Sequence, residues 1–257
     1  MSKASKSEFN FTIVVNCGPC EQYIEKCISS IRDQDCVNWT AVVTADPCGD
    51  NTYERALAAA AGESRIDVRQ NNRQCFAMEN LVRGIERSRA AKNDVIVVLD
   101  GDDWFASPGA LRTIHRVYRS TGCWMTYGSW LSNNPEMPGL WPAYPEGTEN
   151  FRQIRWLATA LRTWKRWLWD LVDRDDFRDE EGRYFRVGED MAAMFPMLEM
   201  SGTDRARHIP EPLMLYNHSN PAGAAKIWRE DLRRTARLIR SRPYYERLCA
   251  PVVAPAA

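Results

Sequence analysis

Three carboxylates lie within four residues directly after the apolar run Asp94–Leu99: Asp100, Asp102 and Asp103. Carboxylates this close repel one another unless a cation or hydrogen bonds compensate them. Magnesium-type sites commonly use one or two carboxylates together with the phosphates of a substrate, and Gly101 lets a ligand approach the backbone closely. The cluster therefore predicts a metal-phosphate site. The alternative is that one of the later two carboxylates simply caps the helix that follows.

Polar residues also follow three other short apolar runs. Asn16 and Gly18 come after the first run, Asp46 after the second, and Asn71, Asn72 and Arg73 after the third. Ligands of parallel α/β proteins bind beyond the carboxyl ends of the strands, so we expect these residues to line one site. The sequence holds neither G-x-G-x-x-G nor a Walker A motif, which argues against the common glycine-rich phosphate loops.

The elements that must position these residues alternate along the first half of the chain. β-branched and apolar runs predict strands at Phe9–Val15, Thr40–Ala45, Ile66–Arg69 and Asp94–Leu99. Helical patterns lie between them at Glu21–Arg32, Asn51–Ala61 and Ala77–Arg89. Strands separated by helical patterns of roughly 10–15 residues indicate βαβ units. The sequence therefore predicts an α/β fold with a mainly parallel sheet flanked by helices.

The second half predicts a more helical region. Residues 132–150, which include four prolines, are expected to form a long loop, a candidate for a mobile lid over the site. Helices are expected at Arg152–Val172, at Met191–Met200 with an interruption at Pro196, and at Ala224–Arg240. Extended segments are expected over Ala206–Asn217, and the end of the chain from Pro251 is expected to fray.

The tryptophan- and arginine-rich segment Arg152–Val172 has three interpretations. Its apolar residues share one helical face, which is typical of a stripe that packs on the core and leaves Arg155, Arg162 and Arg166 on a solvated basic face. Exposed tryptophans would instead form a platform for a sugar acceptor. A basic helix of this kind can also contact an anionic membrane surface, and Ala224–Arg240 could do the same.

Composition limits the class of protein. The 257 residues include 34 basic and 34 acidic side chains, a formal net charge of zero, which argues against a dedicated nucleic-acid binder. No apolar run approaches the ~20 residues that span a bilayer, and Met1–Asn10 lacks the apolar segment of a signal peptide. We therefore expect a soluble cytoplasmic protein, in which the eight cysteines are reduced thiols.

Several segments together resemble a known family. The run VIVVLDGDDWF (95–105) is similar to the D-x-D segment of family 2 glycosyltransferases with a GT-A fold. ADPCGDNT (45–52) keeps the second Asp, the later Asp and the Thr of the family's D-D-G-S-x-D-x-T pattern. Asn72 and Asn80 match the stretch that precedes the D-x-D strand, and Gly188-Glu189-Asp190 is similar to the acceptor-side E-D motif.

Three further stretches, LRTWKRWLW, FPMLEMSG and LYNHSNP, resemble segments of bacterial members of the family, so that the resemblance spans about residues 10–225. It implies a GT-A glycosyltransferase domain over residues 1–222. The nucleotide-sugar-binding half is expected at 8–105 and the acceptor half at 106–222. Residues 223–257 are then a C-terminal helix and tail that pack across the domain or touch a partner.

The resemblance also implies a donor site for a UDP-, GDP- or dTDP-linked sugar. Its implied contacts are Asn16, Gly18, Asp46, Asn72, Arg73, Asn80, Asp100, Gly101 and Asp102. Among these, Asp46 would bind the nucleobase edge and Asp100 the ribose. Asp102, with Asp100, would hold Mn²⁺ or Mg²⁺, and His218 would be a further metal or phosphate contact.

On the acceptor side, the resemblance implies that Asp190 is the general base, with Glu189 beside it. A base on one face of the sugar and a departing diphosphate on the other give displacement with inversion. The acceptor would be a hydroxyl of a glycan or of a lipid-linked or polysaccharide precursor. These motifs name neither the sugar nor the nucleobase of the donor.

Two alternatives remain open at this point. Cys17-Gly18-Pro19-Cys20 is the tetrapeptide of thioredoxins, which would make the chain a thiol–disulfide oxidoreductase. Asn16, however, stands where thioredoxins have Trp, and that activity leaves the carboxylates unexplained. The aromatic residue that the family places near Gly18 is absent, so a nucleotide-sugar-binding module without catalysis is the second alternative.

Overall fold

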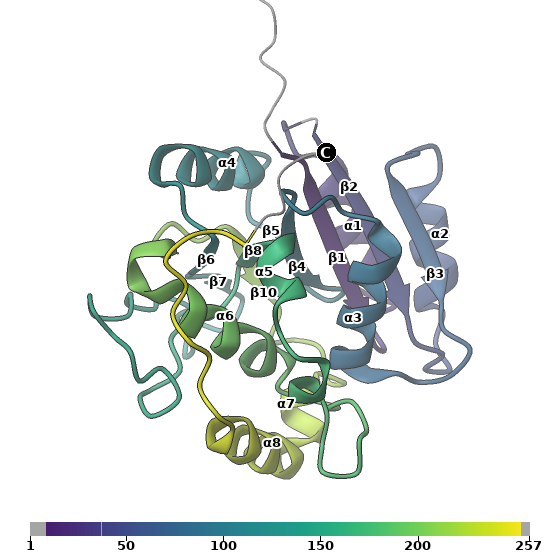
Figure 1. Ribbon diagram of the computed structural model, residues 1–257. Coiled ribbons are helices and arrows are strands. Elements are labelled where there is room, and N and C mark those ends of the chain that lie inside the picture. The colour runs from purple at the N-terminus through teal and green to yellow at the C-terminus, as the bar shows by residue number, and fades with distance from the viewer. Residues whose placement is uncertain (1–8, 37, 253–257) are drawn as a thin grey trace, which may run out of the picture.

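The computed structural model describes residues 9–36 and 38–252, and predictions about residues 1–8 and 253–257 lie outside this range. A seven-stranded sheet in the order β3-β2-β1-β4-β8-β6-β9 forms its centre (Figure 1). These strands are β1 (Phe11–Cys17), β2 (Trp39–Ala45), β3 (Ile66–Gln70), β4 (Val95–Asp100), β6 (Met125–Gly128), β8 (Arg162–Lys165) and β9 (Ala206–Ile209). A small second sheet joins β5 (Trp104–Phe105), β10 (Met214–Tyr216) and β7 (Leu131–Ser132).

The first half is the parallel α/β unit that its apolar runs predict. β1 pairs in parallel with both β2 and β4, and β2 pairs in parallel with β3. All seven residues of β1 are buried, as expected for a strand covered on both faces. One face packs on α1 (Ile24–Arg32), α2 (Thr52–Ala60) and α4 (Ala110–Thr121), and the other on α3 (Phe76–Ser88).

The prediction of a helix over Arg152–Val172 is wrong. Residues 162–165 form β8, which runs antiparallel between β4 and β6, and only α5 (Arg166–Asp170) is helical. Buried backbone N–H and C=O groups must be hydrogen-bonded, and β8 supplies partners to β4 and β6 that a helix could not. The apolar spacing suits a helix, but pairing with two buried strands decides the local structure.

The tryptophans of this segment belong to the core, so the interpretation as an exposed acceptor platform is also wrong. Trp164, Trp167 and Trp169 are at most 3% exposed. The rings of Trp164 and Trp169 stack with their centroids 5.7 Å apart, and Trp169 stacks in turn on Phe177. Aromatic side chains bury large areas, which is why they fill the space between the sheet and α6 (Glu189–Arg205).

The remaining elements follow the predictions in part. Residues 133–150 hold no helix or strand, as expected. α6 continues through Pro196, and its non-helical residue is Gly202 (φ 57°). The expected C-terminal helix is divided into α7 (Ala224–Ile227) and α8 (Arg229–Ser241). Between them, Trp228 contacts the ring of Phe76 edge-on.

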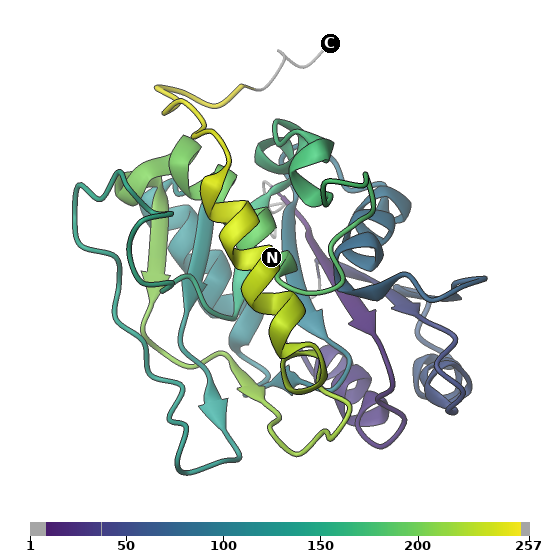
Figure 2. The ribbon, with the colours of Figure 1, turned by 90° about the horizontal axis from the view of Figure 1, so that it is seen from below.

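α8 covers the start of α6. It packs against the start of α6, where Thr235 and Leu232 lie beside Gly188, and Figure 2 shows it lying along this face. Its inward residue Ile239 is 2% exposed. Within residues 9–36 and 38–252, no helix is long and apolar enough to cross a membrane.

Candidate active site

The predicted site residues gather where the parallel strands end. Asn16 on β1 pairs with Asp100 on β4 and with Thr44 on β2. Asp46 directly follows β2, and its N–H donates to the carbonyl of Cys17. Carboxyl ends of parallel strands meet at one edge of a sheet, which is where ligands of such folds bind.

The carboxylates of the Asp100–Asp103 turn are held by residues from the far end of the chain. Asn220 Nδ2 donates to Asp102 Oδ2 at 2.8 Å, and the N–H of Asn217 donates to Asp103 Oδ1 at 2.8 Å. The alternative that these carboxylates cap a helix is wrong, because α4 begins ten residues after Asp100 and its N-cap is Gly109.

Burial makes ionisation of the three carboxyls in this acidic turn unfavourable. Desolvation raises the pKa of Asp100 to about 6, with Arg162 opposing the shift and Asp102 adding to it. Desolvation also raises the pKa of Asp102, against the hydrogen bond from Asn220, and raises that of Asp103 well above its ordinary value. Carboxylates in this state favour a bound cation.

Arg162 is a residue of the candidate site that sequence reasoning missed. It is 8% exposed and lies 3.4 Å from Asp190 Oδ2 and 3.9 Å from Asp100 Oδ2. Because β8 is antiparallel to β4, its first residue reaches the edge where β4 ends; Arg162 pairs with Val98. A strand assignment for 162–165 was the missing signal, since a helix would place Arg162 on a solvated face.

Glu189 and Asp190 begin α6 and face the acidic turn through Arg162. Asp190 is partly exposed, and its Oδ1 accepts the N–H of Met191 at 2.8 Å. Desolvation, followed by the charges of Asp190 and Asp100, raises the pKa of Glu189 to about 8. Glu189 therefore favours its protonated form at neutral pH.

Asp46 is 3% exposed and anchors the start of α3. Its carboxylate accepts the N–H groups of Cys75 (3.0 Å) and Phe76 (2.8 Å), as a helix-capping acid does. Asn71 Nδ2 donates both to Asp46 Oδ1 (2.9 Å) and to Asn80 Oδ1 (2.6 Å). Asp46 and Asn80 thus belong to one buried network.

Some of the other residues predicted to bind the donor are buried at the site and some are exposed. Of the three polar residues predicted after the third strand, Asn71 belongs to the buried network. Asn72 and Arg73, which the resemblance implies as donor contacts, are exposed, and Arg73 pairs with Glu79 at 2.7 Å. Gly18 is exposed too. The amide of Asn16 is buried, and neither its nitrogen nor its oxygen has a partner. An unpaired buried amide is costly, and a bound ligand could satisfy it.

The Cys17/Cys20 pair lies beneath the acidic turn. A Cβ added to Gly101 would meet Cys17 Sγ at 2.7 Å and Cys20 Sγ at 2.9 Å. Both residues are buried, and a hydrogen bond that the Cys17 thiol donates to Cys20, followed by desolvation, raises the pKa of Cys17 well above its ordinary value. Reactive thiols need a lowered pKa and access, so the geometry argues against the oxidoreductase alternative.

His218 packs in an aromatic cluster: its ring lies 4.7 Å from that of Tyr216 and 5.4 Å from that of Trp130. In the described part of the chain, no three His, Cys, Asp or Glu side chains form a ready metal cage. A cation at Asp100 and Asp102 would therefore need further ligands, as at sites that use substrate phosphates.

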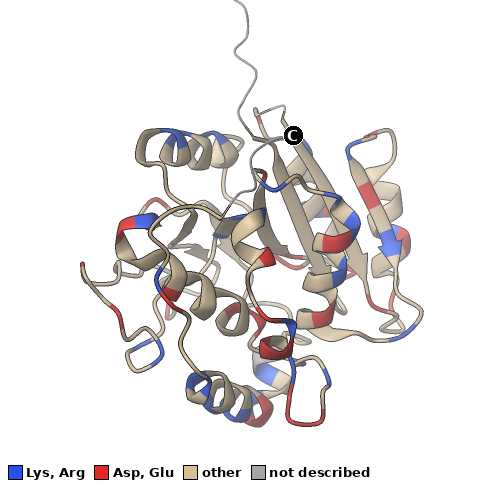
Figure 3. Cartoon of the chain, viewed as in Figure 1, with Lys and Arg blue, Asp and Glu red and all other residues tan. Residues whose placement is uncertain are grey.

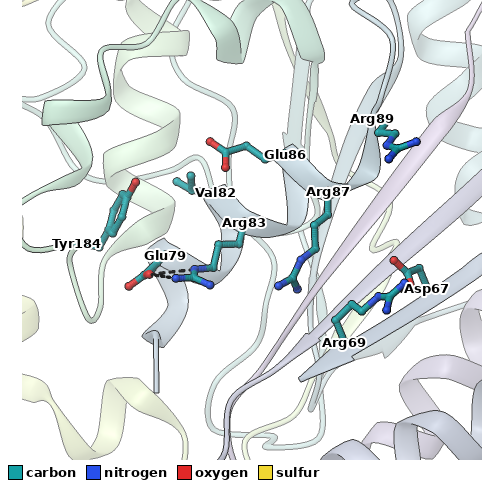
Figure 4. A pocket seen from close by; sticks show the side chains of 9 residues that line it. All are labelled: Asp67, Arg69, Glu79, Val82, Arg83, Glu86, Arg87, Arg89 and Tyr184. Atoms are coloured by element: carbon teal, nitrogen blue, oxygen red, sulfur yellow. Dashed lines mark hydrogen bonds and ion pairs between the residues drawn. The ribbon is translucent and has the colours of Figure 1, made fainter. Parts of the chain in front are cut away.

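A separate hollow lies between β3, α3 and the loop that carries Tyr184 (Figure 4). It measures about 1030 Å³ and is lined mainly by charged residues. Arg69 pairs with Asp67 at 2.8 Å, and Arg83 with Glu79 at 2.8 Å. Its charges largely satisfy one another, unlike those of the acidic turn.

Comparison with known structures shows the fold. TarS of S. aureus in complex with UDP-GlcNAc matches with a TM-score of 0.63 at 14% identity, over 90% of this chain and 65% of that one. The mannosyltransferase PcManGT from Pyrobaculum calidifontis, in complex with GDP-Man and Mn²⁺, matches with 0.63 at 15%, over 93% and 67%. A mycobacterial protein matches with 0.61 at 15%, over 93% and 77%.

These matches confirm the predicted α/β class and the GT-A fold. The chain spans 64% of the length of the TarS fragment 1–349. No curated protein matches the sequence. The model of glycosyl transferase family 2 matches residues 11–174, which include the four parallel strands and the Asp100–Asp103 turn. The chain therefore belongs to glycosyl transferase family 2.

Proposed function

We propose that this protein is an inverting glycosyltransferase that moves a sugar from a nucleotide-diphosphate donor to a hydroxyl of an acceptor. One observation carries the proposal. The acidic turn after β4 and the carboxylate of Asp190 at the start of α6 face one another across Arg162. Transfer with inversion needs this pair of functions: stabilisation of the leaving diphosphate on one side and a base for the acceptor on the other.

The donor is a nucleotide-diphosphate sugar that binds at the carboxyl ends of β1, β2 and β4. The unpaired amide of Asn16 supports this position, because a ligand there would satisfy it. Gly101 and Asp102 contact the diphosphate, and Asp100 the ribose. The carboxylate of Asp46 already accepts two backbone N–H groups at the start of α3. Its role toward the nucleobase is therefore to hold the start of α3 in place beside the nucleobase pocket. Known structures of this fold bind UDP-GlcNAc or GDP-Man.

A divalent cation, Mn²⁺ or Mg²⁺, fits the donor set at the acidic turn. Asp102 and Asp100 offer hard oxygen ligands whose pKa values are raised by desolvation, so a positive charge there relieves an unfavourable state. Asp102 would hold the metal, with Asp100 beside it, together with phosphate oxygens of the donor. When bound, the metal supplies a Lewis acid for the leaving diphosphate.

Asp190 is the general base. Burial raises the pKa of the neighbouring Glu189 to about 8, so Glu189 keeps its proton at neutral pH and cannot accept another. Asp190 is partly exposed and lies at the start of α6 beside the guanidinium of Arg162, so an acceptor hydroxyl can reach it. It removes the proton of the acceptor hydroxyl, and the new bond forms opposite the departing diphosphate.

The acceptor is a glycan or a lipid-linked precursor that enters between the loop 132–150 and α8. Arg residues recur along α8 (Figure 3). Arg229, Arg233 and Arg237 lie four residues apart and are exposed. Such a stripe suits contact with an anionic surface on the cytoplasmic side of a membrane, where a lipid-linked acceptor would be met.

Thermal unfolding in the presence of nucleotides tests the donor site. UDP, GDP, dTDP and CMP are each added with and without Mn²⁺, and unfolding is followed by tryptophan fluorescence. A ligand at 100 times its dissociation constant adds about 2.7 kcal/mol, which raises Tm by several degrees at this chain length. We expect one diphosphate to stabilise the protein only with Mn²⁺.

Two variants complete this test. Asp102→Asn should abolish the Mn²⁺-dependent shift, whereas Asp67→Asn on β3, away from the site, should retain it. Absence of any shift with all four nucleotides would refute the donor site. A shift that persists in Asp102→Asn would show that the nucleotide binds elsewhere. Release of the diphosphate from the matching nucleotide-sugar then measures turnover.

A further inference from the structure

Arg162 is distinguished by its surroundings from the other arginines of the chain. It is 8% exposed, and its two carboxylate partners come from different parts of the fold, Asp100 from β4 and Asp190 from α6. The buried Arg152, by contrast, grips the single acid Glu199 with two bonds of 2.6 and 2.9 Å. Arg162 is shared by two groups rather than locked to one.

The distances show how it is shared. Charge-assisted bonds between Arg and a carboxylate are usually about 2.7–2.9 Å. Arg162 is 3.4 Å from Asp190 and 3.9 Å from Asp100, so neither carboxylate holds it at full contact. The guanidinium lies between them, closer to Asp190, and is the buried cation among the acids that begin α6 and follow β4.

The strand that carries Arg162 is rigidly fixed. β8 is hydrogen-bonded on both sides, to β4 and to β6. The hydroxyl of the next residue, Thr163, is within hydrogen-bond distance of Tyr118 (2.9 Å) and Thr126 (2.7 Å), all three buried. A side chain on a strand held in this way can position its partners accurately.

We propose that Arg162 is a positioning residue for glycosyl transfer: it holds Asp190 toward the acceptor and ties it to Asp100 on the donor side. The inference rests on the proposed function. It adds a residue that none of the sequence motifs contains, and it gives the antiparallel strand β8 a role in linking the two halves of the site. Arg162 acts through the two carboxylates and touches neither donor nor acceptor.

The test compares Arg162→Gln and Arg162→Lys with the wild type. The control is Arg166→Gln, which removes an arginine of the adjacent α5 that pairs with Asp170 at 2.8 Å. The readout is release of the nucleoside diphosphate from UDP-GlcNAc, UDP-glucose and GDP-mannose, with kcat and KM for the donor measured separately. Tm is recorded for every variant.

Loss of one preorganised charged group in an active site typically lowers kcat about 10²- to 10³-fold. We expect a loss of this size in Arg162→Gln, with the donor KM changed by no more than about threefold, since Asp190 is the closer partner. Arg162→Lys should recover part of kcat by restoring the charge, and Arg166→Gln should match the wild type. A kcat within about threefold of wild type in Arg162→Gln would overturn the inference, as would an Arg162→Lys variant no more active than Arg162→Gln at equal Tm.

A measurement without substrate separates this inference from the proposed function. Urea unfolding of Arg162→Gln, Asp190→Asn and the double variant shows whether the two side chains interact in the folded protein. We expect the change in urea midpoint of the double variant, relative to the wild type, to differ from the sum of the changes in the two single variants. Additive shifts would overturn the inference whatever the turnover. If wild type turns over none of the three donors while the shifts are non-additive, the donor proposal fails and the contact stands.

Discussion

Gly101→Ala is a stringent test of how the acidic turn is packed. The added Cβ would lie 2.7 Å from Cys17 Sγ, 2.9 Å from Cys20 Sγ and 3.3 Å from Cys17 Cβ. Favourable contacts between carbon atoms lie at about 3.5–4.0 Å, so the overlap with the thiols approaches 1 Å. Cys17 is 0% and Cys20 4% exposed, so neither thiol has solvent to move into.

Overpacking of this kind typically costs about 1–3 kcal/mol. At this chain length it should lower Tm by roughly 2–12 °C, measured by thermal unfolding and, as a free energy, by urea unfolding followed with tryptophan fluorescence. Because Gly101 lies between Asp100 and Asp102, the shift of the turn should also weaken Mn²⁺-dependent nucleotide binding. Gly18→Ala is the matched control, since its Cβ would meet no atom within 4 Å, and it should change stability by no more than about 0.5 kcal/mol.

Removal of the thiols decides whether the clash is the cause. In a Cys17→Ala/Cys20→Ala background, the Cβ added by Gly101→Ala loses both short contacts with sulfur and keeps the 3.3 Å contact with the Cβ of residue 17. The substitution should then cost much less than in the wild type, because neighbouring substitutions couple when they relieve one clash. An equal cost in both backgrounds would refute the reasoning and point to the backbone of the turn instead.

Three further outcomes are expected. Glu199→Gln leaves Arg152 buried without its charged partner, so it should destabilise the protein by about 3–5 kcal/mol in urea unfolding. Glu181→Gln, which removes one partner of an exposed pair, should cost less than about 1 kcal/mol. Similar losses in the two variants would contradict the argument from burial. Desolvation raises the pKa of Glu189 from 4.5 to about 8. Between these pH values the native state binds more protons than the unfolded state, so the free energy of unfolding falls as the pH rises. The urea midpoint should therefore depend less on pH in Glu189→Gln than in the wild type, and an unchanged slope would count against the pKa shift. Asp190→Asn should abolish release of the diphosphate while the nucleotide-dependent rise in Tm remains, and near wild-type turnover would show that another group is the base.

Much of the donor side was predictable from local pattern. The apolar runs that become β1, β2 and β4 are short and rich in β-branched residues, and polar residues follow each of them. A buried parallel strand leaves little choice of conformation or neighbour, so Asn16, Asp46 and Asp100 could be assigned to one edge from spacing alone.

The acceptor side could not be read in the same way. Residues 152–172 have apolar spacing compatible with a helix, yet 162–165 form a strand because β4 and β6 need a partner for their backbone groups. That partner lies far away in sequence, and no local pattern reports it. The consequence is functional, since the same error placed Arg162 on the surface.

The sequence by itself determined the α/β class, the family, and the turn at Asp100–Asp103 with its acidic chemistry, because each depends on residues close together in the chain. Only the tertiary structure decided which groups face that turn. Asn217 and Asn220 approach it from more than a hundred residues away, and Arg162 reaches it from the antiparallel strand β8. Strand order and register are settled by the pairing of distant backbone groups, and that pairing joins the donor-side carboxylates to Asp190.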